Sequence, residues 1–161
     1  MIRPLEVTTP SDREVVIKRD FDAPVGLVFD CHTKPDLVRR WLLGPPGWTM
    51  PVCDIDLKVG GRYRYVWRGP AGEEMGMGGI YREIAPPGLI VVNEIFDEDW
   101  TGGETTVTTR FEEAGGVTRS TVTVLYSSKE ARDAAKRSGM ADGMEAGYQR
   151  LDELLVATPA A

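Results

Sequence analysis

The chain has 161 residues, of which 42% are hydrophobic and 27% charged, and this composition suits one globular domain with a buried core. The formal net charge is −6 and the Lys and Arg residues are scattered, which argues against a nucleic-acid partner, because a phosphate backbone normally requires clustered positive charge. No apolar run approaches the length of a membrane span, so we expect no membrane partner.

The N-terminal segment, residues 1–11, is expected to be flexible and lacks the basic start and apolar run of a signal peptide. We therefore expect a cytoplasmic protein. In that compartment Cys31 and Cys53 are predicted to be reduced thiols rather than a disulfide.

The first regular elements are a strand and two short helices. Alternating residues from Val15 to Phe21 predict a strand that ends before Pro24. Between Pro24 and Arg40 the apolar residues follow helical spacing, with an interruption at Thr33-Lys-Pro35, which predicts two helices.

The middle of the chain predicts six more strands, separated by Gly-rich and Pro-rich turns typical of an antiparallel meander. Tyr63, Tyr65 and Trp67 alternate with arginines, so one face of this sheet should be apolar and the other polar. The predicted strands are Met50 to Leu57, Arg62 to Arg68, Met75 to Ile84, Leu89 to Phe96, Thr105 to Glu112 and Val117 to Tyr126.

Two helices close the chain: a short polar one from Lys129 to Ser138 and a long one from Met140 to Ala157, followed by a frayed tail over 158–161. The long helix should cover the apolar face of the sheet. On the opposite side of this helix we expect the polar residues Glu145, Gln149, Asp152 and Glu153.

Three glycines stand four residues apart at this last helix. Gly139 reads as the entry turn, whereas Gly143 and Gly147 border a row formed by Met140, Met144 and Tyr148. An interior glycine costs a helix about 1 kcal/mol relative to alanine, so these two indicate either close backbone packing or room for a ligand. We expect Gly143 and Gly147 to border a cavity.

The resulting layout is an α+β fold, a curved antiparallel sheet of about seven strands with a long terminal helix laid across it, in a single domain spanning 12–157.

Several short motifs, in this order, resemble the START-like (helix-grip) superfamily, which includes polyketide cyclases and birch-pollen-allergen-like proteins. Within it, the chain is most similar to bacterial proteins related to the activator of the heat-shock protein 90 ATPase. The resemblance implies a bent sheet that grips the terminal helix around an internal cavity, which often holds an apolar or aromatic molecule. The motifs are Phe21-Asp-Ala-Pro24, Thr33-Lys-Pro35 with Trp41, Val59-Gly-Gly-Arg-Tyr-Arg64, Gly79-Ile-Tyr-Arg-Glu-Ile-Ala-Pro-Pro87 and Gly139-Met-Ala-Asp-Gly-Met-Glu-Ala-Gly-Tyr148.

Candidate ligand-binding residues are the aromatic, methionine and glycine residues, together with Glu94, that the alternation within the strands and the position of the last helix would place around such a cavity. The alternative is that each aromatic belongs to an ordinary core. The candidates are Trp41, Trp48, Tyr63, Tyr65, Trp67, Met77, Glu94, Phe96, Met140, Gly143, Met144, Gly147 and Tyr148.

Glu94, within the apolar run from Leu89 to Phe96, is the first candidate for catalysis, ahead of a tyrosine, Asp54 or Asp56. If it is buried, its pKa should rise and it could act as a general acid or base. The alternatives are that it lies at the exposed end of the strand near Asp97, or that Asn93 faces inward instead.

Metal and nucleotide cofactors are not expected. His32 is the only histidine, no close pair of cysteines is present, and no glycine-rich turn precedes a helix in the manner of a phosphate site. Cys31 and His32 are neighbours on a predicted helix and point about 100° apart, which does not suit a nucleophile and its base.

These observations favour a cofactor-free domain that binds a small hydrophobic or aromatic molecule and sequesters, senses or transports it. A second hypothesis is an enzyme of the polyketide cyclase, hydratase or hydrolase type that uses the same cavity. A third is a protein-interaction module, with a chaperone as partner and the acidic loop Asp97-Glu-Asp-Trp100 as its surface. The sequence does not determine whether the chain forms a homodimer.

Overall fold

The computed structural model describes residues 4–98 and 103–158. Its strands are β1 (Glu6–Thr8), β2 (Glu14–Phe21), β3 (Thr49–Ile55), β4 (Arg62–Arg68), β5 (Glu74–Ala85), β6 (Leu89–Phe96), β7 (Thr105–Ala114) and β8 (Val117–Leu125). Its helices are α1 (Val25–Thr33), α2 (Pro35–Val38), α3 (Lys129–Arg137) and α4 (Met140–Ala157).

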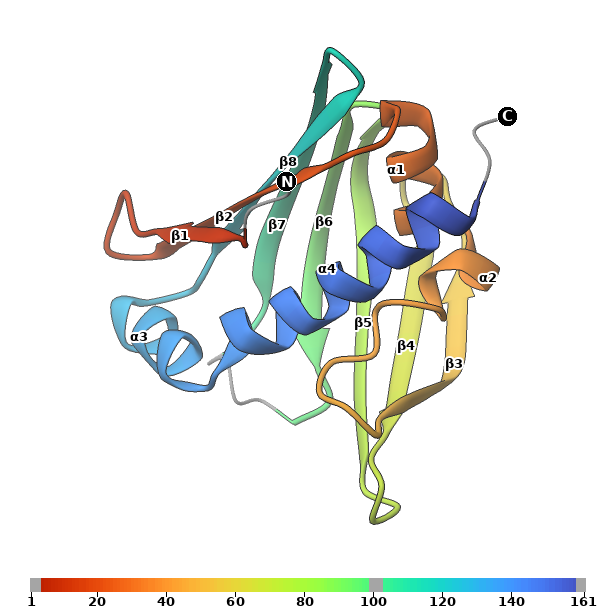
Figure 1. Ribbon diagram of the computed structural model, residues 1–161. Helices are drawn as coiled ribbons and strands as arrows, with labels where there is room; N and C mark the ends of the chain where they lie inside the picture. Colours follow the sequence, from red (N-terminus) through yellow and green to blue (C-terminus); the bar gives the residue numbers. More distant parts are fainter. Residues whose placement is uncertain (1–3, 99–102, 159–161) are drawn as a thin grey trace.

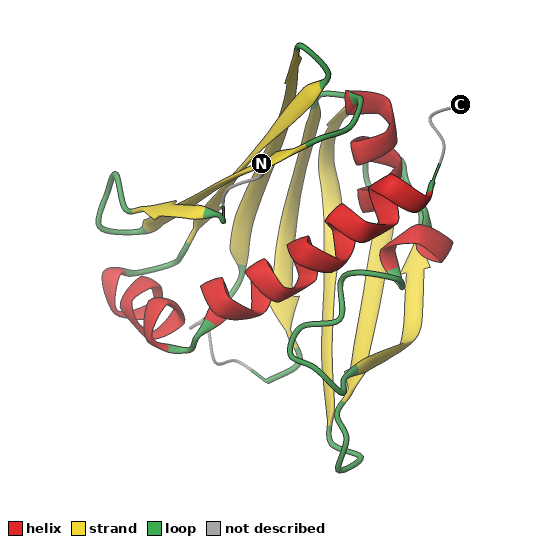
Figure 2. Cartoon of the chain, in the orientation of Figure 1, coloured by secondary structure: helices red, strands yellow, loops and turns green. Residues whose placement is uncertain are grey.

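All of these strands form one antiparallel sheet in the order β1-β2-β8-β7-β6-β5-β4-β3. The sheet curves, and α4 runs across its concave side from α3 towards α1 and α2 (Figure 1). Figure 2 shows that the helices all lie on that one side. The expected α+β helix-grip fold is therefore confirmed.

Strand β1 is an addition to the predicted layout. It lies within residues 1–11, which we expected to be flexible, and pairs with β2 through Glu6↔Lys18, Val7↔Ile17 and Thr8↔Val16. Three residues at a sheet edge carry too short an alternation to be recognised from sequence.

The predicted parity of β4 is confirmed. Tyr63, Tyr65 and Trp67 are buried on the concave side, whereas Arg62 and Arg68 are exposed on the convex side. Successive strand residues point to opposite faces, and residues opposite one another share a face. The residues of β5 and β6 that lie opposite Tyr63, Tyr65 and Trp67 therefore also face the concave side.

An ion-pair cluster fixes α4 against β2. The Arg19 side chain is 2% exposed, donates to both carboxylate oxygens of Glu145 at 3.1–3.2 Å, and donates to both oxygens of Asp152 at 2.8–2.9 Å. Glu145 and Asp152 were expected to face away from the sheet. They instead pair with Arg19 of β2.

Among the described residues, none of the helices is long and apolar enough to cross a membrane.

Candidate functional site

The candidate site is built on one row of the sheet. Tyr63 of β4 is opposite Gly79 of β5, Gly79 is opposite Glu94 of β6, and Glu94 is opposite Thr105 of β7. Residues opposite one another in an antiparallel sheet point to the same face, so all of these face α4.

Tyr63 lies across Gly79 to reach Glu94. Its hydroxyl donates a hydrogen bond of 2.6 Å to Glu94 Oε2. A Cβ atom added to Gly79 would lie 2.5 Å from atoms of the Tyr63 ring. Gly79 is therefore a glycine because the ring occupies the place of its side chain.

The apolar run from Leu89 to Phe96 contains two polar residues, Asn93 and Glu94, and the orientation of β6 determines which of them faces inwards. Glu94 points towards the concave side, whereas Asn93 lies on the other face, where it accepts a hydrogen bond from Arg82 and donates one of 2.9 Å to Thr106. Glu94 is only partly buried, so the carboxylate keeps some accessible surface although it is inside the curve of the sheet.

This environment changes the acidity of Glu94. Burial raises the pKa of its carboxyl above the usual range, and the hydrogen bond from Tyr63 opposes this rise in part. A carboxyl with a raised pKa, inside the fold, has the property that a general acid or base requires.

The charge of Glu94 also acts on further tyrosines. Burial raises the pKa of Tyr63, Tyr65 and Tyr126, and the charge of Glu94 adds to the rise in each case; for Tyr126 the pKa reaches about 12. These hydroxyls therefore stay neutral at physiological pH. Tyr81 of β5 packs on Tyr63, with ring centroids 5.3 Å apart. We call Glu94 with Tyr63, Tyr65, Tyr81 and Tyr126 the carboxylate cluster.

The first half of α4 lies over this cluster. The Tyr126 hydroxyl contacts Met140 Sδ at 3.5 Å, and Met140 and Met144 are partly buried against the core. A Cβ atom added to Gly143 would have no neighbouring atom within 4 Å. The expectation that Gly143 borders a cavity stays a prediction, because Gly143 is also partly exposed.

The second half of α4 is packed tightly, which corrects the expectation for Gly147. A Cβ atom there would lie 3.1 Å from the Trp41 carbonyl oxygen. Trp41 stacks on Tyr148 with ring centroids 5.8 Å apart, and its indole nitrogen donates to the Cys31 carbonyl at 2.8 Å. Gly147 therefore allows close packing and does not border a cavity.

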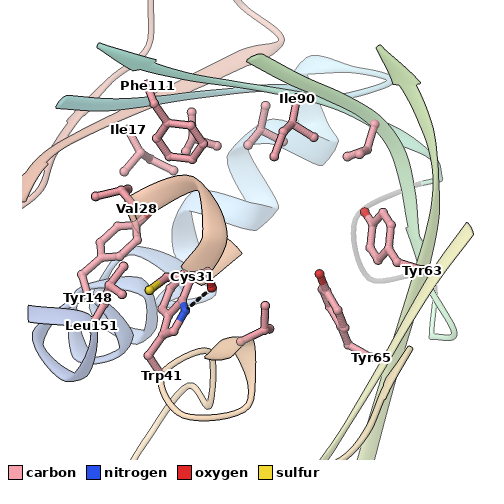
Figure 3. Close-up of a cluster of buried hydrophobic side chains, with 14 of the residues drawn as sticks. Ile17, Val28, Cys31, Trp41, Tyr63, Tyr65, Ile90, Phe111, Tyr148 and Leu151 are labelled. Atoms are coloured by element: carbon pink, nitrogen blue, oxygen red, sulfur yellow. Dashed lines mark hydrogen bonds between the residues drawn. The ribbon is translucent and has the colours of Figure 1, made fainter. Parts of the chain in front are cut away.

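Figure 3 shows this separation: Trp41 and Tyr148 lie together on the helix side, and Tyr63 and Tyr65 reach inwards from the strands opposite. We call Trp41, Gly147 and Tyr148, with Arg19 and His32 beside them, the packed region. Of the predicted ligand-binding residues, Trp41, Gly147 and Tyr148 thus belong to this core.

The remaining predicted residues divide by exposure. Met77 and Trp67 are buried, and the Trp67 indole donates to the Leu42 carbonyl at 2.7 Å. Phe96 is partly buried in the row Tyr65–Met77–Phe96, adjacent to that of Glu94. Trp48 is partly buried in the loop before β3.

The internal cavity itself stays a prediction. The structure has a shallow surface depression of about 20 Å³ beside β1 and β2, lined by Pro4, Glu6, Lys18, Arg19, Asp20 and Arg119. That volume holds about one water molecule, so this depression does not suit the expected ligand.

Within the described parts of the chain, no three His, Cys, Asp or Glu side chains lie close enough to hold a metal ion. Cys31 and Cys53 are buried free thiols, as expected, and burial raises the pKa of both. His32 lies between the rings of Trp41 and Phe111, and its Nδ1 is 2.7 Å from the Val28 carbonyl.

The acidic loop proposed as a protein-binding surface lies partly outside the described residues, which exclude 99–102. Asp97, at its start, forms a bidentate ion pair of 2.6 Å with Arg64. The frayed tail likewise falls outside from residue 159 onwards.

Sequence reasoning missed three members of the site. Gly79 and Tyr81 stand in a motif that we used only for fold recognition, and the parity of β5 would have placed both beside Tyr63. Tyr126 ends the alternation of Val122 and Val124, which predicts the same inner face, but it was not included among the ligand-binding residues.

Comparisons with known proteins agree with this architecture. A family model described as activator of Hsp90 ATPase homolog 1-like protein matches residues 22–156. The chain belongs to this family. Its fold also fits the START-like superfamily to which the sequence motifs pointed.

Solved structures include close relatives. A protein from Rhodobacter sphaeroides is 35% identical, with 97% of this chain and 100% of that chain covered and a TM-score of 0.92. A protein from Mycobacterium smegmatis is 27% identical, with 99% and 100% covered and a TM-score of 0.82. One from Arthrobacter aurescens is 26% identical, with 95% and 92% covered and a TM-score of 0.82. The search of curated proteins gives no match.

Proposed function

We propose that this protein binds a small apolar or aromatic molecule between β4–β6 and the first half of α4, and that it sequesters, senses or carries that molecule. The observation that carries the proposal is Glu94, a carboxylate on the inner face of the sheet that is desolvated yet keeps accessible surface. A side chain packed against protein on all sides would have none, so Glu94 is accessible to a ligand.

Two features of the surroundings support the same position. A side chain added at Gly143 would meet no atom within 4 Å, and the partly buried Met140 and Met144 provide flexible apolar surface on the same part of α4. On the sheet side, the tyrosine rings offer apolar faces with polar ends, a combination suited to aromatic ligands.

The proposal is tested by native mass spectrometry of protein purified from its own host. We expect a co-purifying small molecule on the unmodified protein and its loss in Gly143→Leu, because a leucine would fill the space beside the glycine. Asp142→Leu is the matched control, since Asp142 is exposed on the same helix turn. Circular dichroism confirms that both variants are folded.

A second measurement uses a defined probe, 2-naphthol, added to the delipidated protein and followed by ligand-detected NMR. We expect binding to the unmodified protein and to Asp142→Leu but not to Gly143→Leu. If the protein binds neither a natural adduct nor any small-molecule probe, or if Gly143→Leu binds as well as its control, the proposal is wrong.

A second candidate function is proton-transfer catalysis in the same place, favoured by the inward direction of Glu94 and its raised pKa. An ionised Glu94 would remove a proton from carbon beside a ligand carbonyl, and a neutral tyrosine hydroxyl would donate a hydrogen bond to the enolate oxygen. Deuterium exchange into 2-tetralone, followed by NMR, tests this. Exchange that is faster than in buffer and lost in Glu94→Gln supports it; equal exchange rates overturn it.

A further inference from the structure

Glu94 has more hydrogen-bonding capacity than the described protein uses. A carboxylate accepts up to about four hydrogen bonds, and here Tyr63 supplies one, to Oε2. In residues 4–98 and 103–158, no Arg or Lys side chain forms an ion pair with Glu94 or donates a hydrogen bond to it. The second oxygen, Oε1, therefore has capacity for a further donor, and it is not among the fully buried atoms without a partner in the described residues.

Tyr63, which contacts this carboxylate, belongs to a group of aromatic rings. The Tyr63 ring centroid is 5.0 Å from that of Tyr65 and 5.3 Å from that of Tyr81, and the Tyr65 ring is 5.8 Å from Trp67. The face of an aromatic ring carries partial negative charge and attracts cations, most strongly where water is excluded. The aromatic rings and the Glu94 carboxylate thus both favour a positively charged partner.

The packed region contains the same combination of aromatic rings and carboxylates, and there a cation lies between them. There the Arg19 guanidinium lies 5.1 Å from the Phe21 ring centroid and 5.9 Å from that of Tyr148, and it pairs with Glu145 and Asp152. The carboxylate cluster has the rings and the carboxylate of that arrangement but lacks its cation in the described residues.

We propose that the ligand supplies this cation: a protonated amine or quaternary ammonium group on an apolar or aromatic body, with the charged end against Glu94 and the rings of Tyr63 and Tyr65. The body would lie beneath Met140 and Gly143. This inference rests on the proposed function, since it names the chemical class of ligand for the same site.

A neutral hydroxyl on the ligand would also donate to Glu94, but the protein already holds neutral donors near this carboxylate, at Tyr63, Tyr65 and Tyr126. What it lacks is positive charge, which compensates a desolvated carboxylate far more strongly than a hydroxyl does. The raised pKa of Glu94 has burial as its main cause, and a bound cation would lower that pKa again.

The test compares two probes of the same shape by ligand-detected NMR titration: benzyltrimethylammonium and its neutral carbon analogue, neopentylbenzene. We expect the cation to bind unmodified protein at least about tenfold more tightly. In Glu94→Gln this preference should disappear, because the amide is isosteric but uncharged. Glu83→Gln, which neutralises an exposed carboxylate on β5, is the control and should keep the preference.

A pH series on the unmodified protein provides a test that needs no variant. Benzyltrimethylammonium keeps its charge at every pH, so a change in its affinity reports on the protein. The titratable groups around Glu94 are Tyr63 and Tyr65 of β4, Tyr81 of β5 and Tyr126 after β8, and all have raised pKa values and stay neutral. Affinity should therefore rise with pH as Glu94 ionises and then level off, with no such rise for neopentylbenzene.

The outcomes separate this inference from the proposed function. Equal affinity for the two probes, or a preference that survives Glu94→Gln, overturns the cationic ligand and leaves the apolar binding site in place. Binding of 2-naphthol with no binding of benzyltrimethylammonium does the same. If none of the three probes binds, the proposed function fails as well.

Discussion

The two interior glycines of α4 lie about one helical turn apart and have opposite surroundings. Gly147 faces the Trp41 carbonyl at a distance that excludes even a methyl group without displacement, whereas Gly143 has no neighbour within 4 Å of an added Cβ. One helix thus closes the core at its second half and leaves space at its first half.

The charged groups differ in the same way between the two regions. In the packed region, Arg19 has both of its carboxylate partners and two aromatic rings. In the carboxylate cluster, Glu94 has one tyrosine hydroxyl and retains accessible surface. Removing one partner of a buried ion pair leaves an uncompensated charge, whereas an underpaired carboxylate has capacity for a partner that a ligand provides.

The largest effect that would sharpen this comparison is expected from Arg19→Met. Removing the guanidinium leaves Glu145 and Asp152 without their cation, and we expect a loss of about 3 kcal/mol in the free energy of unfolding, measured with urea. The control is Arg64→Met, which breaks the exposed pair with Asp97 and should cost less than about 1 kcal/mol. Equal losses would contradict the assignment of Arg19 to a packed region.

The next effect concerns pH and His32. Burial lowers the pKa of His32 to about 4 from 6.5, so the unfolded chain binds the proton more readily than the folded one. Stability from this residue is complete above pH 6.5 and is lost as the pH falls towards 4. Between pH 7 and pH 5 we expect a loss of about 2 kcal/mol.

Urea unfolding at the two pH values checks this, with His32→Gln as reference, because carboxyl groups contribute to both proteins and cancel in the difference. A His32→Gln protein that loses as much stability as the unmodified one would show that His32 titrates normally and is not enclosed by Trp41 and Phe111.

A smaller effect, but one of opposite sign at the two positions, is expected for the glycines of α4. Gly143→Ala should raise the free energy of unfolding by up to about 1 kcal/mol, because alanine favours the helix and meets no obstacle. Gly147→Ala should lower it by about 1 kcal/mol, because the contact with the Trp41 backbone outweighs the same helical gain. The same sign for both substitutions would break the contrast between the two halves of α4.

The most local effect is on the acidity of Glu94 in Tyr63→Phe. The hydrogen bond from Tyr63 favours the ionised carboxylate, so its loss should raise the pKa of Glu94 further. Carbon-detected NMR titration of the Glu94 carboxyl measures this. Tyr81→Phe is the control, since the Tyr81 hydroxyl donates no hydrogen bond to Glu94 and the pKa should change less. An unchanged pKa in Tyr63→Phe would contradict the contact.

Most of the strands and helices could be predicted from sequence because their signals are local. Tyr63, Tyr65 and Trp67 alternate with arginines within β4 itself, and glycine or proline marks the turns. β1 could not be predicted in this way, since it depends on the edge of β2 rather than on its own three residues.

The site was predictable only in part. Glu94 was a candidate because a carboxylate in an apolar strand is unusual, but the run Leu89 to Val92 has no alternation that would show which face is inner. The register with Gly79 and Tyr63 settles that Glu94, not Asn93, points inwards.

The sequence by itself determined the element order, the family and a set of aromatic, methionine and glycine residues, because periodicity and turn chemistry act between near neighbours. Only the tertiary structure decided which of these residues belong to the packed region and which lie near the carboxylate cluster. Gly143 and Gly147 have the same local signal, and what separates them is the position of Trp41, more than a hundred residues away in the chain. Distances between such remote segments are set by the packing of the whole domain and are not encoded in any short stretch of it.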